Sequence, residues 1–256
     1  MGNIRFLPLL MLLWSGTEIA WSMTAKKTMM IRVGVAANFR ATFQHLAEQF
    51  RESSGSRIEI TSGSTGSLLR QIQNGAPLDM FLAADQKHIS ALVQSGHGTE
   101  DDRFVYARGR LVFWSQNLPD IQQEKVFLGE ELTLAIANPI TSPYGSAAKK
   151  MLDALKKKNR DVHQRLLMGS SVSQVLQFAF ADSRITGVVS LAQALLPIAE
   201  KKGNYFLIPR HWYPPIIQEG LILKRCVDRQ ICRRLVTFLR DERGKKIIRS
   251  QGYMIP

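Results

Sequence analysis

The chain has 256 residues, of which 45% are hydrophobic and 21% charged, and its formal net charge is +13. This composition excludes a chain that is disordered throughout, and the length allows one large domain or two lobes with buried cores. A basic chain can bind anionic ligands, acidic surfaces or nucleic acid, so charge alone does not choose among these partners.

The N-terminal segment has the pattern of an export signal. Arg5 precedes an apolar run, residues 6–14, and Ala20-Trp21-Ser22 fits a small-x-small cleavage site. The run is too short to span a bilayer. We predict that residues 1–22 are a secretory signal peptide cleaved near Ser22, the alternative being a buried N-terminal helix. A periplasmic location follows, and it makes nucleic acid an unexpected partner.

Strand-like and helical patterns alternate through the first half of the chain. Residues 31–37 and 78–84 are apolar strand candidates, and Ile58 and Ile60 alternate as in a strand. Helical spacing follows each of them. The predicted helices carry Phe39, Phe43, Leu46, Ala47 and Phe50, then Leu68, Leu69 and Ile72, then Ile89, Leu92 and Val93. Gly55 is expected to end the first helix, and Asp85 to cap the third.

The same alternation resumes after a long extended run, residues 103–114, that Gly109 interrupts. Residues 132–136 and 185–189 are strand candidates. Helices are expected from Ser146 onward and around Val175–Phe180, and residues 216–223 read as extended. Ten Lys and Arg residues between 224 and 249 indicate basic C-terminal helices with a solvated face.

Repeated strand–helix units predict an α/β fold with mostly parallel sheets flanked by helices. The two extended runs are natural crossings between two lobes, which would make a two-segment hinge. We place one lobe at residues 30–108 plus 219–256 and the other at residues 109–218.

Four predicted strand-to-helix junctions carry small polar residues: 36–39, 62–66, 138–145 and 170–173. A helix start offers free backbone N–H groups and a partial positive charge, so four such starts could surround one small dianion. None of the four segments contains Lys or Arg, so every donor would be neutral. The alternative is ordinary capping, because Ser, Thr and Asn are common N-caps and Gly is common in turns.

Several motifs occur in one order along the chain: Val35-Ala36-Ala37-Asn38-Phe39, Ser62-Gly63-Ser64-Thr65-Gly66, Asn74-Gly75-Ala76-Pro77, Phe81-Leu82-Ala83-Ala84-Asp85, Leu111-Val112-Phe113-Trp114-Ser115, Asn138-Pro139 and Pro143-Tyr144-Gly145. From about residue 30 onward the sequence resembles the periplasmic molybdate-binding proteins, the ModA-type substrate-binding proteins of ABC importers. The resemblance implies a two-lobed type II periplasmic-binding-protein fold. It also implies capture of molybdate, or tungstate, between the lobes and delivery to a membrane permease by a monomer without cofactor.

The resemblance also implies roles for individual residues. Asn38 and Thr65 match hydrogen-bond donors of the family, Tyr144 matches a ligand-facing tyrosine, and Val172 matches a backbone N–H donor. Ala37 stands where the family has Ser or Thr, so only its N–H could donate. Ser64 and Ser171 are lower-ranked neighbours, and no metal cation is expected.

Three other functions compete with this prediction. A hydrolytic enzyme lacks support because Ser64 is not in a Gly-x-Ser-x-Gly elbow and the five histidines are scattered. The effector domain of a regulator would need a DNA-reading helix-turn-helix segment. A binding protein for sulfate, phosphate or another oxyanion remains the closest alternative, because similar cradles suit those anions.

Cys226 and Cys232 are the only cysteines. On a single helix their Cα atoms would be about 9 Å apart at the usual rise per residue, which exceeds the reach of a disulfide. We therefore expect two semi-buried free thiols.

Overall fold

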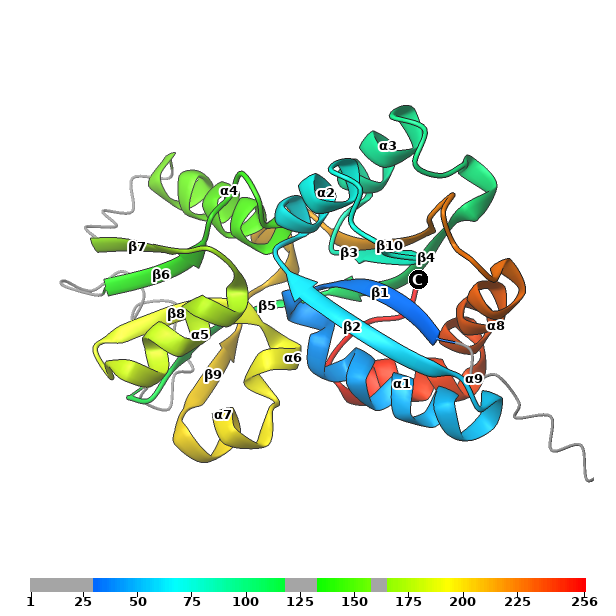
Figure 1. Cartoon of the computed structure of the whole chain (residues 1–256). Helices are drawn as coiled ribbons and strands as arrows, with labels where there is room; N and C mark the ends of the chain where they lie inside the picture. The colour runs from blue at the N-terminus through cyan, green and yellow to red at the C-terminus, as the bar shows by residue number, and fades with distance from the viewer. Residues whose placement is uncertain (1–29, 118–132, 158–164) are drawn as a thin grey trace, which may run out of the picture.

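The computed structural model describes residues 30–117, 133–157 and 165–256, which form two α/β lobes side by side (Figure 1). Each lobe is built on one five-stranded sheet, as the predicted two-lobed α/β fold requires. The predicted signal peptide, residues 1–22, and Leu132 lie outside the described residues. Within those residues, no helix has both the length and the apolar character needed to cross a membrane.

The first sheet has the strand order β2-β1-β3-β10-β4. Its strands are β1 (Met30–Ala36), β2 (Arg57–Gly63), β3 (Met80–Ala83), β4 (Arg103–Gly109) and β10 (Ile216–Ile222). Its helical segments are η1 (Ala37–Phe39), α1 (Arg40–Ser54), α2 (Thr65–Gln73), α3 (Gln86–Gln94), η2 (Glu100–Asp102), α8 (Arg229–Arg240) and α9 (Glu242–Ser250). The two C-terminal helices pack against α1, so the end of the chain returns to the lobe where the described chain begins.

The second sheet has the corresponding order β7-β6-β8-β5-β9. Its strands are β5 (Leu111–Ser115), β6 (Thr133–Ala137), β7 (Arg165–Gly169), β8 (Ile185–Ser190) and β9 (Asn204–Leu207). The helical segments are α4 (Pro143–Lys157), α5 (Val172–Ala181), α6 (Leu191–Ala194), α7 (Pro197–Lys202) and η4 (Arg210–Trp212).

Strand direction explains why the carboxyl ends of four strands in each sheet face the other lobe. In each sheet a single strand, β10 or β5, runs antiparallel to both of its neighbours, and the other four run in one direction. Each reversed strand is the first one after the chain crosses between lobes, so its amino end lies at the crossing. The carboxyl ends of β1, β2, β6 and β7 must therefore point toward the opposite lobe.

Local chemistry accounts for the elements that the sequence predicts. Phe43, Leu46 and Phe50 lie on the buried face of α1, which ends at Gly55 in a left-handed conformation (φ 70°). Asp85 caps α3 through its carboxylate and the N–H of His88, as predicted. The extended run of residues 103–114 is split between the two sheets at Gly109, which is the first crossing.

Several elements differ from the sequence-based prediction. The strand expected at residues 78–84 is shorter, Met80–Ala83, and α4 begins at Pro143 rather than at Ser146. The short strands β7 and β9 and the short helices α6 and α7 were not predicted. β7 is an edge strand with three exposed residues of five, so it lacks the apolar run that marks a buried strand. The second of the predicted lobe boundaries, between residues 218 and 219, falls inside β10. The division into lobes at these residues remains a prediction.

The prediction of two free thiols is wrong, because Cys226 and Cys232 form a disulfide. Cys226 lies in the turn before α8, and only Cys232 is on the helix. The turn brings the two Cα atoms to 7.2 Å, whereas a continuous helix would have kept them about 9 Å apart.

Candidate functional site

All four junctions predicted from the sequence occur, and each leads from a strand into a helical segment. β1 enters η1 and α1, β2 enters α2, β6 leads to α4, and β7 leads to α5. Serines cap three of these helices: Ser64 Oγ accepts from the N–H of Ser67 at 3.4 Å, Ser142 Oγ from Gly145 at 3.3 Å, and Ser171 Oγ from Gln174 at 3.3 Å. Ordinary capping, the alternative explanation for these residues, therefore does occur at three junctions. Whether the junctions also form a site depends on their other contacts.

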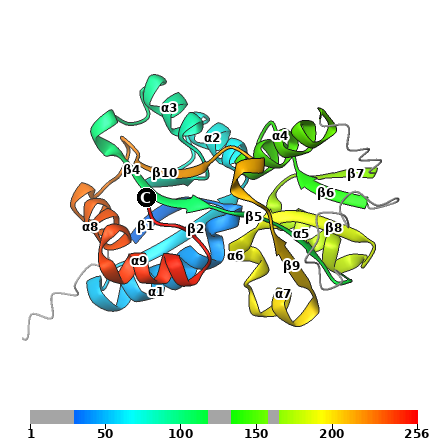
Figure 2. The same cartoon turned by 180° about the vertical axis from the view of Figure 1, so that it is seen from behind.

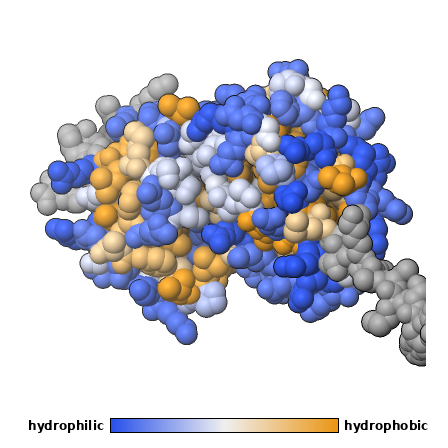
Figure 3. Space-filling model, in the orientation of Figure 1, coloured by the Kyte–Doolittle hydropathy of each residue, from blue (hydrophilic) through white to orange (hydrophobic). Residues whose placement is uncertain are grey.

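Two direct contacts join the junctions of one lobe to those of the other. The N–H of Gly66, at the start of α2, donates to the carbonyl of Thr141, before α4, at 2.8 Å. The hydroxyl of Ser173, in the first turn of α5, donates to the carbonyl of Ala37 at 3.5 Å. The second junction thus meets the third, and the first meets the fourth. The four helix starts converge between the lobes, where residues of intermediate hydropathy gather in Figure 3.

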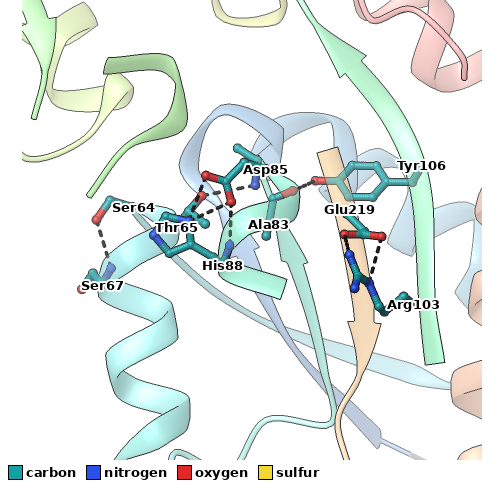
Figure 4. Close-up of polar contacts among 10 residues, drawn as sticks. Ser64, Thr65, Ser67, Ala83, Asp85, His88, Arg103, Tyr106 and Glu219 are labelled. Atoms are coloured by element: carbon teal, nitrogen blue, oxygen red, sulfur yellow. Dashed lines mark hydrogen bonds and ion pairs between the residues drawn. The ribbon is translucent and has the colours of Figure 1, made fainter. Parts of the chain in front are cut away.

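Thr65 is the first residue of α2 and its side chain is only 1% exposed. Its Oγ1 accepts a hydrogen bond from the N–H of Ala84 at 3.2 Å, which links α2 to the end of β3 (Figure 4). Since the oxygen is the acceptor there, the hydroxyl hydrogen remains available for donation. The main-chain N–H of Thr65 has no partner within its own helix, because the first turn of a helix never provides one.

The side chains of Asn38 and Tyr144 meet at Gln218 on β10. Asn38 Nδ2 donates to Gln218 Oε1 at 2.8 Å and to Tyr253 Oη at 3.1 Å, which uses both amide hydrogens. Gln218 Nε2 donates to Tyr144 Oη at 3.4 Å. The side chains of Asn38 and Tyr144 therefore belong to one buried network that joins the lobes. Their main-chain N–H groups, at helix starts, remain the candidate donors.

This network keeps its phenols neutral. Burial raises the pKa of Tyr144 and of Tyr106 well above the ordinary value, and it raises the pKa of Tyr253 as well. Tyr106 Oη shares its single hydrogen between the carbonyl of Ala83 at 3.0 Å and Gln218 Oε1 at 3.2 Å. Neutral phenols add no negative charge near a site for an anion.

Ala37, Val172 and Ser64 lie around the same convergence. Val172 is buried as the first residue of α5, next to the Ser173 that contacts Ala37. Val172 and Tyr144 belong to one apolar cluster with Ala36 and Ala84 of the first lobe, so this cluster continues across the interface. The Ser64 hydroxyl oxygen is occupied as the cap of α2.

Sequence reasoning missed Gln218, Tyr253 and Ser142. Gln218 is fully buried and lies at a register shift in the pairing of β10 with β4. A lone amide within the apolar run of residues 216–223 is a signal that could have marked it, because buried polar groups need partners. Beside the bulge, Glu219 is buried and accepts from Arg103 Nη2 at 2.9 Å (Figure 4). Tyr253 gave no signal, since its hydrogen-bond partner Asn38 is 215 residues away.

His88 lies behind the second junction. Its Nδ1 is held between the two oxygens of Asp85 at 2.7 and 2.9 Å. A Cβ placed on Gly66 would lie 3.3 Å from His88 Nε2 and 3.0 Å from the Cα of Thr141. Gly66 therefore sits between a side chain of its own lobe and the backbone of the other, where close approach requires glycine. Among the residues that the structure describes, no cluster of three or more His, Cys, Asp or Glu has metal-binding geometry.

Comparisons with known proteins agree with this arrangement. The family model for bacterial extracellular solute-binding proteins matches residues 31–254. The molybdate-binding protein ModA of Azotobacter vinelandii is 34% identical over 225 residues, which cover 87% of this chain and 89% of the relative. The molybdate-binding protein ModA of Rhodobacter capsulatus is 30% identical over 221 residues, 86% of each chain.

A solved structure extends the similarity to three dimensions. The periplasmic molybdate-binding protein of Azotobacter vinelandii matches with a TM-score of 0.77 and 31% identity, covering 88% of this chain and 99% of that one. These matches confirm the resemblance to ModA-type proteins that the sequence motifs indicated. The match to the family model and the identity with these relatives show that the chain belongs to the family of bacterial extracellular solute-binding proteins.

Proposed function

We propose that this protein captures molybdate between its lobes outside the cytoplasm and delivers it to the permease of an ABC importer. The observation that carries the proposal is the convergence of four helix starts through the contacts of Gly66 with Thr141 and of Ser173 with Ala37. The names of the relatives at 30% and 34% identity supply the ligand.

The proposed ligand contacts come mainly from the main chain. The N–H groups of Ala37, Asn38, Thr65, Tyr144 and Val172 would donate to the oxyanion, together with the hydroxyl of Thr65. Ser64 and Ser171 would act indirectly, by fixing the first turns of α2 and α5. The Asn38 amide has both hydrogens in use, and Tyr144 Oη, which accepts from Gln218, lies where a Cβ of Gly109 would be, at the first crossing. We therefore assign both side chains to positioning the junctions.

A cage of neutral donors suits a dianion that must be released later. Each hydrogen bond to a charged partner contributes about 1.5–3 kcal/mol, so several together offset the cost of removing water from the anion. The positive ends of the helix dipoles further stabilise the bound anion. Molybdate carries no proton at neutral pH, and a site made only of donors favours such an anion over one that must itself donate.

We further propose that the mature protein is periplasmic, that residues 1–22 direct its export, and that it acts without catalysis or a cofactor. Tungstate, an oxyanion of similar size and charge, is proposed as a second ligand. The binding unit is proposed to be the monomer, with its lobes divided into residues 30–108 plus 219–256 and residues 109–218.

Calorimetric titration of the mature protein with molybdate, tungstate, sulfate and phosphate tests this proposal. We expect one tight site for molybdate and tungstate, and at least about a hundredfold weaker binding of the other two in that site, which corresponds to about 2.8 kcal/mol. Equal affinity for sulfate would overturn the choice of molybdate. Absence of binding by all four anions would overturn an oxyanion site altogether.

A further inference from the structure

The two crossings between the lobes carry positive charge and no negative charge. Residues 104–117 and 204–218 include Arg108, Arg110 and Arg210, and neither segment contains Asp or Glu. Figure 2 shows both crossings from behind, the green segment from β4 to β5 and the orange segment from β9 to β10. Like charges without counter-charges repel one another, and a bound anion would relieve that repulsion.

A cavity of about 530 Å³ lies at these crossings, and Arg108, Arg210, His211, Tyr213 and Met254 are among the residues that line it. The C-terminal segment forms one wall, because Arg108 and Met254 exchange two backbone hydrogen bonds of 2.7 and 3.0 Å. No lining residue of this cavity is acidic. Its volume lies within the usual range for small-molecule sites.

The guanidinium groups around the cavity have spare donors. Arg210 Nη1 donates to the thioether sulfur of Met254 at 3.4 Å, and a thioether is a weak acceptor. In the described parts of the chain, no carboxylate forms an ion pair with Arg108, Arg110 or Arg210. Each guanidinium carries five N–H donors in a planar fork, and among the described residues the bond from Arg210 to Met254 uses one of them.

Tyr213 shows that two of these charges converge. Its Oη accepts from the N–H of Leu111 at 3.1 Å, which links the two crossings and leaves the phenol hydrogen to donate. Burial raises the pKa of Tyr213, whereas the hydrogen bond from Leu111 and the charges of Arg110 and Arg210 lower it. Arg110 and Arg210 come from different crossings, and the charges of both act on the same hydroxyl.

We propose that this hinge cavity is a second anion site, separate from the interlobe site, for a phosphate-like tetrahedral dianion. Arg108 and Arg210 would each use two parallel N–H groups to bind it, as arginine does with phosphate, and His211 and Tyr213 would complete the cradle. The bound anion would join the two crossings and so change the balance between open and closed lobes. By linkage, the hinge anion would change the affinity of the interlobe site for its ligand. The interlobe ligand would change the affinity of the hinge site by the same factor.

Inorganic phosphate is the probe, titrated by calorimetry into full-length mature protein, both alone and after one equivalent of molybdate. The variants are Arg108→Gln/Arg210→Gln and, as a matched control, Arg233→Gln/Arg234→Gln on the exposed face of α8, which removes the same charge. We expect one phosphate per protein in the presence of molybdate. We expect its affinity to fall at least about tenfold in the hinge variant, because charge-assisted hydrogen bonds are lost, and to be unchanged in the control.

The site is overturned by any of three results: no phosphate bound by the wild type, equal binding by the hinge variant, or equal loss in the α8 control. The hinge site itself does not depend on the proposed function, whereas its effect on the interlobe site does. If molybdate fails to bind but phosphate binding still requires Arg108 and Arg210, the hinge site stands and the molybdate assignment fails.

Discussion

The Thr65 hydroxyl has one observed partner, the N–H of Ala84, and one proposed partner, the bound anion. The oxygen accepts from the N–H of Ala84, and the hydrogen is free to donate to an anion. The change Thr65→Val keeps the shape but removes both interactions. We expect molybdate affinity to fall about 10- to 150-fold, from the loss of about 1.5–3 kcal/mol, with a loss of folding stability of about 1–3 kcal/mol from the unsatisfied N–H.

Thr65→Ser is the matched control, because it retains the hydroxyl and should retain most of the affinity. Calorimetry gives the affinity, and urea denaturation gives the stability. If the valine variant binds molybdate as tightly as the wild type, Thr65 does not contact the ligand.

Tyr144 is a residue at which the structure and the family resemblance lead to different expectations. Its hydroxyl oxygen accepts from Gln218 and lies against Gly109 at the first crossing. Tyr144→Phe should therefore change molybdate affinity by less than about threefold, while folding stability falls by about 1 kcal/mol near pH 7. Burial raises the pKa of Tyr144 in the folded state. The stability that this neutral phenol contributes is therefore present below the unfolded pKa, near 10, and declines as pH rises above it.

The wild type should accordingly lose stability faster than the phenylalanine variant above about pH 10. Urea denaturation at pH 8, 10 and 11 measures the difference. A tenfold loss of molybdate affinity in Tyr144→Phe would mean that the hydroxyl, rather than the main chain, binds the anion.

At the scale of elements, the disulfide anchors the start of α8 to the turn that follows β10. Replacing Cys226 and Cys232 by alanine should reduce the free energy of unfolding by about 2 kcal/mol, the value expected for so short a loop. Molybdate affinity should not change, because α8 packs mainly on α9, α1, β4 and β10 and supplies none of the proposed ligand contacts.

A reducing agent provides the control for this prediction. It should lower the stability of the wild type to that of the double variant and leave the variant unchanged, as measured by urea denaturation. Equal wild-type stability with and without the reducing agent would contradict a stabilising role for the disulfide.

At the scale of the whole molecule, closure depends on how near the lobes can approach at Gly66. A methyl group there would lie 3.0 Å from the Cα of Thr141 and 3.2 Å from its carbonyl oxygen, so backbone of the opposite lobe would have to move. We expect Gly66→Ala to weaken molybdate binding about tenfold, in keeping with the cost of overpacking. The radius of gyration with ligand should also be larger than that of the wild type.

Gly63→Ala is the control for closure, since its methyl group would meet only Leu68 at 3.7 and 3.9 Å, an ordinary contact. Small-angle X-ray scattering with and without molybdate reports the lobe positions. If Gly66→Ala closes and binds like Gly63→Ala, the contact with Thr141 does not limit closure.

The sequence by itself determined the α/β class, the four strand-to-helix junctions and the family, because helical and strand periodicity, N-caps and motif order are local properties. Only the tertiary structure decided how the junctions pair, where the Asn38 and Tyr144 side chains point, and that the two cysteines join. Asn38 reaches Gln218, 180 residues away, and the turn before α8 shortens the distance between the cysteines. Such contacts depend on which distant segments the fold brings together, and local sequence patterns do not specify those pairings.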